Sequence, residues 1–293
     1  MRMRRFTQLF APSLPLARRP MATHALSTAA CLIIGDEVLN GKIRDANSYT
    51  FAKFCFEIGL DLKRVEVIGD EEHEIVEAAQ RMAKEYDFVV TSGGIGPTHD
   101  DITYQSIAKA FDLPLVLHEE TVKRMQRLGI RRLDPNDKEA INAQMRMATL
   151  PKGTPATEAE VIYSLENSWV PVVRVASKIH ILPGIPQLFN GLLFGLRKII
   201  LPNIPPSQRK HRLLVTTYKA ESEMASFLTQ LQERVKDREI KIGSYPHMVG
   251  INTVSIIGKE EYLDYMKELV KETEEALEGK AISIEDEAKL SSK

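Results

Sequence analysis

The sequence predicts an α/β fold: a three-layer arrangement in which a mostly parallel sheet carries helices on both faces. Between residue 29 and about residue 111, short apolar runs alternate with segments whose apolar residues recur at helical spacing. The connections between these segments are short. Strand–helix alternation with short connections is typical of right-handed βαβ units, which build parallel sheets. A domain of this class is therefore expected over residues 29–203.

The same patterns place the individual elements of the first half. Apolar runs predict strands at residues 32–34, 62–68, 87–91 and 115–117. Helical spacing predicts helices at residues 47–58, 72–86 and 102–111. Gly59 is expected to end the first helix, because glycine readily adopts the left-handed conformation found after helix termini.

The second half of this domain is less regular. Residues 119–150 are expected to be helical, with an interruption at Asp134-Pro135, and residues 151–169 to form a loop. A hairpin is expected over residues 170–181. A helix should follow the next turn and continue to about residue 200.

A small α+β domain is predicted over residues 209–286, after a linker marked by Pro202, Pro205 and Pro206. Strands are expected at 211–217, 239–243, 250–258 and 281–285, and helices at 221–236 and 260–279. This β-α-β-β-α-β order is that of a ferredoxin-like domain. Residues 287–293 are expected to form a tail.

The first 28 residues form a basic tail of different composition. Residues 1–30 hold five arginines and no acidic residue. Arginine-rich, acid-free segments are typical of mitochondrial transit peptides, and a disordered basic tail fits the composition equally well. Met21 offers an alternative start that would remove the tail. A mitochondrial or a cytoplasmic location, or both, is therefore expected.

Composition argues against two classes of partner. The formal net charge is −1, so the chain as a whole has no general electrostatic attraction for nucleic acid or anionic lipid. No uninterrupted apolar stretch approaches the length of a membrane span. The two cysteines, Cys31 and Cys55, lie in apolar patterns and are expected to be core residues rather than a disulfide. Neither nucleic acid nor a membrane is an expected partner.

The segment from Thr91 to Asp101 gives the strongest indication of chemistry. It follows an apolar strand, precedes a helix, and reads Thr-Ser-Gly-Gly-Ile-Gly-Pro-Thr-His-Asp-Asp. Glycines let the backbone approach a ligand, and consecutive N–H groups near a helix N-terminus form a nest for an anion. A tight turn with a helix cap is the structural alternative. The number of glycines, and their place at the carboxyl end of a strand, favour a phosphate site. The residues expected to bind phosphate here are Ser92, Gly93, Gly94, Gly96, Pro97 and Thr98.

Carboxylates near this segment suggest a divalent cation. Asp100 and Asp101 stand in tandem beside the glycines, and carboxylates close to phosphates usually hold Mg²⁺ or a similar hard cation. Asp36 leaves the end of the first strand directly. Asp45 or Asn47 is expected to cap the helix that follows, and at least one residue of that segment to bind a ligand. We expect Asp36, Asp45, Asp100 and Asp101 to hold the metal, with Asp36, Asp100 and Asp101 catalytic.

Two further segments read more simply as local structure. Residues 182–187, Leu-Pro-Gly-Ile-Pro-Gln, suggest a rigid turn before a helix. In residues 67–72, Val-Ile-Gly-Asp-Glu-Glu, Gly69 is expected to make the turn and Asp70 to cap the next helix.

Together, the segments at residues 35–48, 67–72, 91–101 and 182–187 resemble the molybdopterin-binding (MoCF, or MoaB/Mog-like) domain. The version they resemble is that of CinA-type proteins and of the N-terminal half of eukaryotic FAD synthases. The resemblance covers about residues 30–200, and the sequence Gly243-Ser244-Tyr245-Pro246 extends it toward the C-terminal unit. It also adds Asn47, Pro183 and Gly184 to the expected nucleotide-binding residues.

The resemblance implies an FAD or ADP-ribose pyrophosphatase that uses divalent cobalt or magnesium, aided by potassium. A second reading is a molybdopterin-binding or adenylylating protein of molybdenum-cofactor synthesis. A third is a non-catalytic nucleotide-binding module. All three imply a small nucleotide or pterin ligand, and family members are commonly homo-oligomers, either dimers or trimers.

Two departures limit what the resemblance implies. Residues 154–158, Thr-Pro-Ala-Thr-Glu, stand where CinA proteins carry a Gly-Thr-Ala-Pro-Gly-like loop, so CinA-style substrate contacts are not expected there. The sequence ends at Lys293 without a stretch matching the synthase's adenylyl-transfer domain or CinA's deamidase domain. FAD synthesis is therefore not expected.

Overall fold

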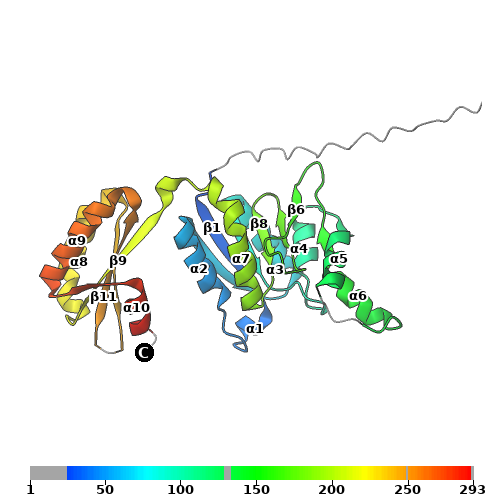
Figure 1. Cartoon of the computed structure of the whole chain (residues 1–293), viewed down its shortest axis with the longest axis horizontal. Helices are drawn as coiled ribbons and strands as arrows, with labels where there is room; N and C mark the ends of the chain where they lie inside the picture. Colours follow the sequence, from blue (N-terminus) through cyan, green and yellow to red (C-terminus); the bar gives the residue numbers. More distant parts are fainter. Residues whose placement is uncertain (1–24, 129–132, 249, 292–293) are drawn as a thin grey trace, which may run out of the picture.

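The computed structural model describes residues 25–128, 133–248 and 250–291. The predicted transit peptide and the alternative start at Met21 lie outside the described residues and stay predictions. The described part of the chain forms a large α/β unit and a smaller α+β unit, joined by a short proline-containing connection (Figure 1).

A six-stranded sheet forms the centre of the large unit, in the order β2-β1-β3-β8-β7-β6. Its first four strands are parallel: β2 (Asp61–Ile68), β1 (Thr28–Ile34), β3 (Phe88–Ser92) and β8 (Ile179–Leu182). The last two strands, β7 (Val172–Val175) and β6 (Ala159–Ile162), are antiparallel. The predicted mostly parallel sheet is confirmed.

Helices cover both faces of this sheet, as predicted (Figure 1). On one face lie α2 (Asn47–Ile58) and α7 (Pro186–Ile200), and on the other α3 (Glu72–Glu85) and α4 (Thr103–Ala110). Gly59 ends α2 at φ 89°, the left-handed conformation expected of it.

Strand β1 shows why the three layers form. Its buried residues alternate between two hydrophobic cores: Ala29, Cys31 and Ile33 face α2 and α7, whereas Ala30, Leu32 and Ile34 face α3 and α4. Successive side chains of a strand point to opposite faces, so a continuous apolar run needs helices on both sides. The last residues of β1, Ile33 and Ile34, lie at the carboxyl edge of the sheet, beside the loops that follow the parallel strands.

Two strands differ from the sequence-based expectation. The strand at β4 (Leu115–Leu117) pairs antiparallel with β5 (Thr149–Pro151) in a separate two-stranded sheet rather than joining the main one. The expected loop at 151–169 contains β6, an edge strand of four residues. Four residues are too few for alternation to stand out from a loop.

The predicted helical stretch before these strands is two short helices, α5 (Glu119–Arg127) and α6 (Lys138–Arg146). The interruption lies where Asp134-Pro135 predicted it. Asp137 begins α6 as an N-cap, because its carboxylate accepts a hydrogen bond from the amide of Ala140 at 2.9 Å.

The smaller unit has the strand order of a ferredoxin-like domain, β10-β11-β9-β12, with every neighbouring pair antiparallel. Its strands are β9 (Lys210–Thr217), β10 (Lys241–Pro246), β11 (Asn252–Lys259) and β12 (Lys280–Ile282). Helices α8 (Glu221–Val235) and α9 (Leu263–Leu277) pack on this sheet. A final helix, α10 (Ile284–Ser291), occupies part of the expected last strand and tail.

The two units touch near the start of β9. The Arg212 guanidinium lies 4.6 Å above the Phe56 ring of α2, and Lys210 forms an ion pair with Asp61 of β2. Two short 3-10 helices, η1 (Leu201–Asn203) and η2 (Pro206–Gln208), carry the chain across. Among the described residues, no helix combines the length and the apolar character needed to cross a membrane.

One buried histidine makes the fold sensitive to pH. His180 on β8 is 4% exposed, packs 4.6 Å from the Phe88 ring, and bonds the carbonyl of Lys178 through Nδ1 at 2.9 Å. Burial, aided by the charge of Arg174, lowers the pKa of His180 to about 4. The folded state therefore holds this imidazole neutral under conditions where the unfolded chain would bind a proton.

We predict that the free energy of unfolding falls by on the order of 2 kcal/mol between pH 7 and pH 5, because His180 gains a proton only on unfolding. The contribution is complete above the unfolded pKa of about 6.5 and is lost as pH falls toward 4. His180→Leu should remove this part of the pH dependence. Urea unfolding of both proteins across this range measures it, and an unchanged slope in His180→Leu would contradict the assignment.

Candidate functional site

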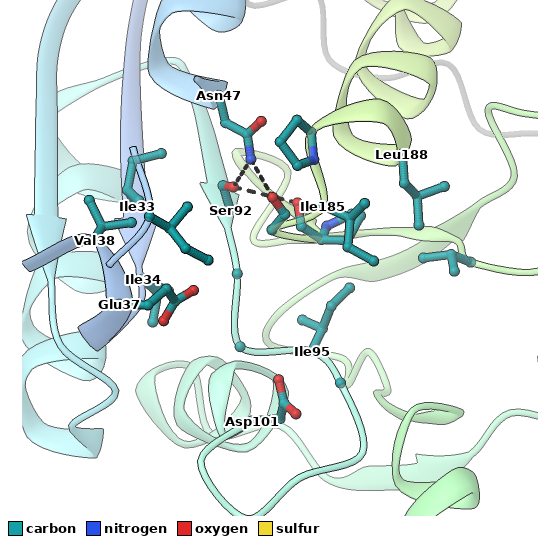
Figure 2. Close-up of a pocket in the computed structure, with 18 of the residues that line it drawn as sticks. Ile33, Ile34, Glu37, Val38, Asn47, Ser92, Ile95, Asp101, Ile185 and Leu188 are labelled. Atoms are coloured by element: carbon teal, nitrogen blue, oxygen red, sulfur yellow. Dashed lines mark hydrogen bonds between the residues drawn. The ribbon is translucent and has the colours of Figure 1, made fainter. Parts of the chain in front are cut away.

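A pocket of about 490 Å³ opens at the carboxyl edge of the parallel strands. Three segments line most of it: the chain after β1, the chain after β3, and residues 183–186 after β8. Figure 2 shows these segments converging on one cavity. In open α/β sheets, ligands bind at this edge, and the volume is within the range of small-molecule sites.

Close backbone approach fixes the glycine loop after β3. Gly93 has φ 115°, and a Cβ there would lie 2.0 Å from the carbonyl oxygen of Ile34 at the end of β1. Gly94 has φ 64°, and a Cβ there would lie 2.3 Å from the hydroxyl of Thr103. A Cβ on Gly184, from the loop after β8, would meet the Cα of Gly93 at 3.4 Å. Gly93 is the position where only glycine allows two backbones to meet, and the contact at Gly184 is an ordinary van der Waals distance.

The loop presents fewer free amides than its sequence suggested. The Gly93 N–H donates to the Leu182 carbonyl at 3.2 Å, and the Thr98 N–H donates to the Asp101 carboxylate at 2.8 Å. Proline 97 has no N–H to offer. Three successive amides have no acceptor among the described residues: those of Gly94, Ile95 and Gly96. These amides are the candidate donors to an anion.

An asparagine ties the three segments together. The side-chain amide of Asn47, at the start of α2, donates to the Ser92 hydroxyl and to the Gly184 carbonyl, each at 2.8 Å (Figure 2). Asn47 is 5% exposed, and its Oδ1 has no partner among the described residues. An unpaired buried acceptor costs free energy, and in this case the other end of the same amide joins the three loop segments.

Two of the predicted metal ligands, Asp45 and Asp101, accept hydrogen bonds from backbone amides. Asp45 accepts hydrogen bonds from the amides of Asn47 at 2.8 Å and Ser48 at 3.2 Å, so it holds the first turn of α2 from one residue before the cap position, which is Ala46. Asp101 accepts from the amide of Thr98 at 2.8 Å and from its hydroxyl at 2.5 Å. Each carboxylate therefore orders the loop that precedes or follows it.

A second group of acids gathers beside the pocket. Asp70 accepts a hydrogen bond from the amide of Asp36 at 2.9 Å, whereas Glu71, without a side-chain cap bond, occupies the cap position of α3. The expectation that Asp70 caps this helix is therefore wrong, because its carboxylate turns toward the end of β1. Burial, and then the charges of Glu37, Asp36 and Asp100, raise the pKa of Asp70.

Such a concentration of negative charge suits a cation that arrives with a phosphate. Among the described residues, no three acidic, histidine or cysteine side chains converge closely enough to hold a metal ion alone. Mg²⁺ usually binds one or two carboxylates, with phosphate oxygens and water completing its shell. Asp36 and Asp70, adjacent to each other and half-buried or exposed, fit that kind of site.

The structure brings most of the predicted site residues to one place. Ten of them line the pocket: Asp45, Asn47, Ser92, Gly93, Gly94, Gly96, Pro97, Asp101, Pro183 and Gly184. Asp36, Thr98 and Asp100 lie outside its lining. Asp36 joins the group around Asp70, and Thr98 bonds Asp101.

Sequence reasoning missed the apolar wall and the basic side chain of the pocket. Trp169, Met147, Ile185 and Leu188 line the cavity, and so does Arg44. Trp169 and Met147 lie in segments that read as loop or surface helix, with no motif to mark them. Arg44 directly precedes Asp45, one of the predicted metal ligands, and that position was the available signal.

Comparison with known proteins identifies the class of this domain. Residues 30–204 match the family model described as "Probable molybdopterin binding domain". This match covers more than half of the chain, so the chain belongs to this family.

The curated relatives include FAD synthases of Caenorhabditis and proteins of Pyrococcus and Thermococcus. The chain is 31% identical to "Probable FAD synthase" of Caenorhabditis briggsae over 249 residues, which cover 79% of this chain and 46% of that protein. It is 30% identical to "Protein TK1472" of Thermococcus kodakarensis over 266 residues, covering 88% of this chain and 99% of that protein. The chain thus spans less than half the length of the synthase relatives.

A solved structure shares the fold. The CinA protein of Thermoplasma acidophilum is 28% identical, covering 59% of this chain and 99% of its own, with a TM-score of 0.50. The expected relation to CinA-type and FAD synthase proteins is therefore confirmed.

We predict that Gly93→Ala lowers the free energy of unfolding by more than about 3 kcal/mol, because its methyl group would overlap the Ile34 carbonyl. Gly41→Ala is the matched control: Gly41 also has a positive φ, of 75°, but a Cβ there would meet nothing within 4 Å. That variant should lose only about 1 kcal/mol. Thermal or urea unfolding measures both, and equal losses would contradict the close-approach argument.

Proposed function

We propose that this domain hydrolyses the pyrophosphate bond of a dinucleotide such as FAD or ADP-ribose, with a divalent metal. The observation that carries the proposal is the row of three unpaired amides, Gly94 to Gly96, between an acidic group and a largely apolar pocket. The amides suit a phosphate, the acidic group suits a cation bound to that phosphate, and the apolar pocket suits a flat or apolar group. FAD-like dinucleotides have each of them.

The chain's own residues would orient the phosphate and stabilise charge on it. Amides held at fixed positions by the backbone contacts of Gly93 and Gly184 need no rearrangement when negative charge develops. Asn47 and Ser92 keep the loops after β1, β3 and β8 in register, so they position the nest rather than touch the reacting bond.

The acids fit a cation bound jointly with the substrate, through Asp36 and Asp70, with Glu37 and Asp100 nearby. Magnesium or cobalt there would neutralise phosphate charge and lower the pKa of a water molecule. Potassium remains part of the proposal through the family resemblance. Asp45 and Asp101 support the site by ordering their loops.

A second candidate is binding or adenylylation of molybdopterin. The family model's description names this ligand, and the apolar wall of the pocket suits a flat heterocycle. The phosphate of a pterin would use the same three amides. A pterin co-purifying with the protein, identified by its fluorescence after oxidation, would favour this function.

Hydrolysis of FAD, ADP-ribose and NADH, each with and without Mg²⁺ or Co²⁺, separates the candidates. Metal-dependent release of AMP, by addition of water across the phosphorus–oxygen–phosphorus bridge, supports the hydrolase. Nucleotide binding without turnover under every condition would contradict it and favour a non-catalytic binding module.

We predict that Asp36→Asn lowers metal-dependent FAD hydrolysis about a hundredfold or more, since a metal-binding carboxylate contributes several kcal/mol to the transition state. Asp101→Ala should also lose hydrolysis, because both the charge and the Thr98 bonds disappear. Glu71→Gln, which removes an exposed charge next to Asp70, is the control and should retain full activity. Asp36→Asn or Asp101→Ala with wild-type rates would end the assignment.

Assembly and location are further parts of the proposal. We expect a homo-oligomer, dimer or trimer. Large apolar side chains stand exposed on α2, α7 and the turns before them, including Tyr49, Ile185 and Phe194. Light scattering of the purified protein tests the assembly. Imaging the full chain and a chain starting at Met21 tests the mitochondrial and cytoplasmic locations.

A further inference from the structure

Arg44 is a basic side chain without an ion-pair partner on the wall of the pocket. It is exposed, and no ion pair among the described residues involves it. Every other charged side chain of the pocket lining is acidic: Glu37, Asp45 and Asp101. Two of these, Asp45 and Asp101, already accept hydrogen bonds from their own turns. The Arg44 charge is thus available to a ligand.

Hydrogen bonds of the residues before and after Arg44 hold its backbone in place. The Ile43 amide donates to the Glu37 carbonyl at 2.9 Å, and Asp45 holds the first turn of α2. The backbone that carries the guanidinium therefore cannot move far, although the side chain keeps its reach. A residue placed in this way loses little conformational freedom of the backbone when it binds.

Arg44 and the three free amides come from neighbouring strands. Arg44 follows β1, the amides follow β3, and Ile33 pairs with Ser92 where these strands end. Arg44 lies beyond the end of β1, and it lines the same ligand-sized pocket as Gly94 to Gly96, which places the guanidinium and the three amides around one cavity. A guanidinium–phosphate contact is a charge-assisted hydrogen bond, which is stronger than a bond between neutral groups.

We propose that Arg44 binds the second phosphate of a pyrophosphate whose first phosphate lies on the amides of Gly94 to Gly96. This inference rests on the proposed function, because it assigns a pyrophosphate to the same pocket. Arg44 then sets specificity: it distinguishes a diphosphate from a monophosphate. A guanidinium suits this task, because it presents several N–H donors in a fixed plane to phosphate oxygens.

The protein contains its own reporter for the test. Its single tryptophan, Trp169, lines the pocket, so ligand binding should change its fluorescence. The probes are AMP and α,β-methylene-ADP, a diphosphate whose carbon bridge cannot be hydrolysed, each titrated with Mg²⁺ present. The proteins are the full chain, Arg44→Gln, Arg44→Lys and Lys42→Gln. Lys42 is an exposed cation two residues away that does not line the pocket.

Arg44→Gln should weaken binding of α,β-methylene-ADP about tenfold while changing that of AMP less than about threefold, since one charge-assisted contact is lost. Arg44→Lys should recover most of the loss, because the charge remains. Lys42→Gln should bind both probes as the full chain does. Equal weakening of both probes, an equal effect in Lys42→Gln, or no effect in Arg44→Gln would each overturn the proposal.

The same experiment separates this inference from the hydrolase proposal. Selective loss of diphosphate binding in Arg44→Gln, in a protein that does not hydrolyse FAD, would support the Arg44 contact and end the hydrolase assignment. If instead the protein hydrolyses FAD and its Arg44→Gln variant binds the diphosphate normally, the hydrolase assignment is supported and the Arg44 contact is overturned. Failure of the full chain to bind either probe would overturn both.

Discussion

The contact between the backbone at Gly93 and the last carbonyl of β1 is the constraint on which the site depends. It brings the loop after β3 against the ends of β1 and β8, where a Cβ would overlap Ile34. With the loop in this place, the Gly93 N–H pairs with Leu182, and the amides of the next three residues, which line the pocket, have no acceptor among the described residues. The nest is therefore a consequence of strand packing as much as of the loop's own sequence.

Around that contact, polar side chains act mainly on the backbone. Asn47 joins three loops, Asp45 holds the first turn of α2, and Asp101 orders the turn after the glycines. Asp70 also accepts a bond from the backbone, at Asp36, but it lies among further acids, and the guanidinium of Arg44 has no ion pair among the described residues. A pocket with fixed amides, an acidic rim and one cation is suited to an anion that carries a metal.

Family membership agrees with this arrangement and leaves its chemistry open to experiment. A domain matched to the molybdopterin-binding family, and similar to CinA and to part of FAD synthase, has a pocket that suits a heterocycle joined to phosphate. FAD-like dinucleotides and pterins both have that form. The proposed contact of Arg44 with a second phosphate would distinguish a pyrophosphate ligand from a pterin that carries one phosphate.

The alternation of strands and helices, the glycine loop and most of the polar residues of the pocket could be predicted from the sequence, because these depend on local periodicity and on glycine's backbone freedom. The sequence did not determine the pairing of β4 or the existence of β6, since both depend on which distant strand lies alongside. Only the tertiary structure turned Asp70 from an expected helix cap into a partner of Asp36, and brought Trp169 and Arg44 to one cavity. Those contacts join residues far apart in the chain, and local patterns carry no information about them.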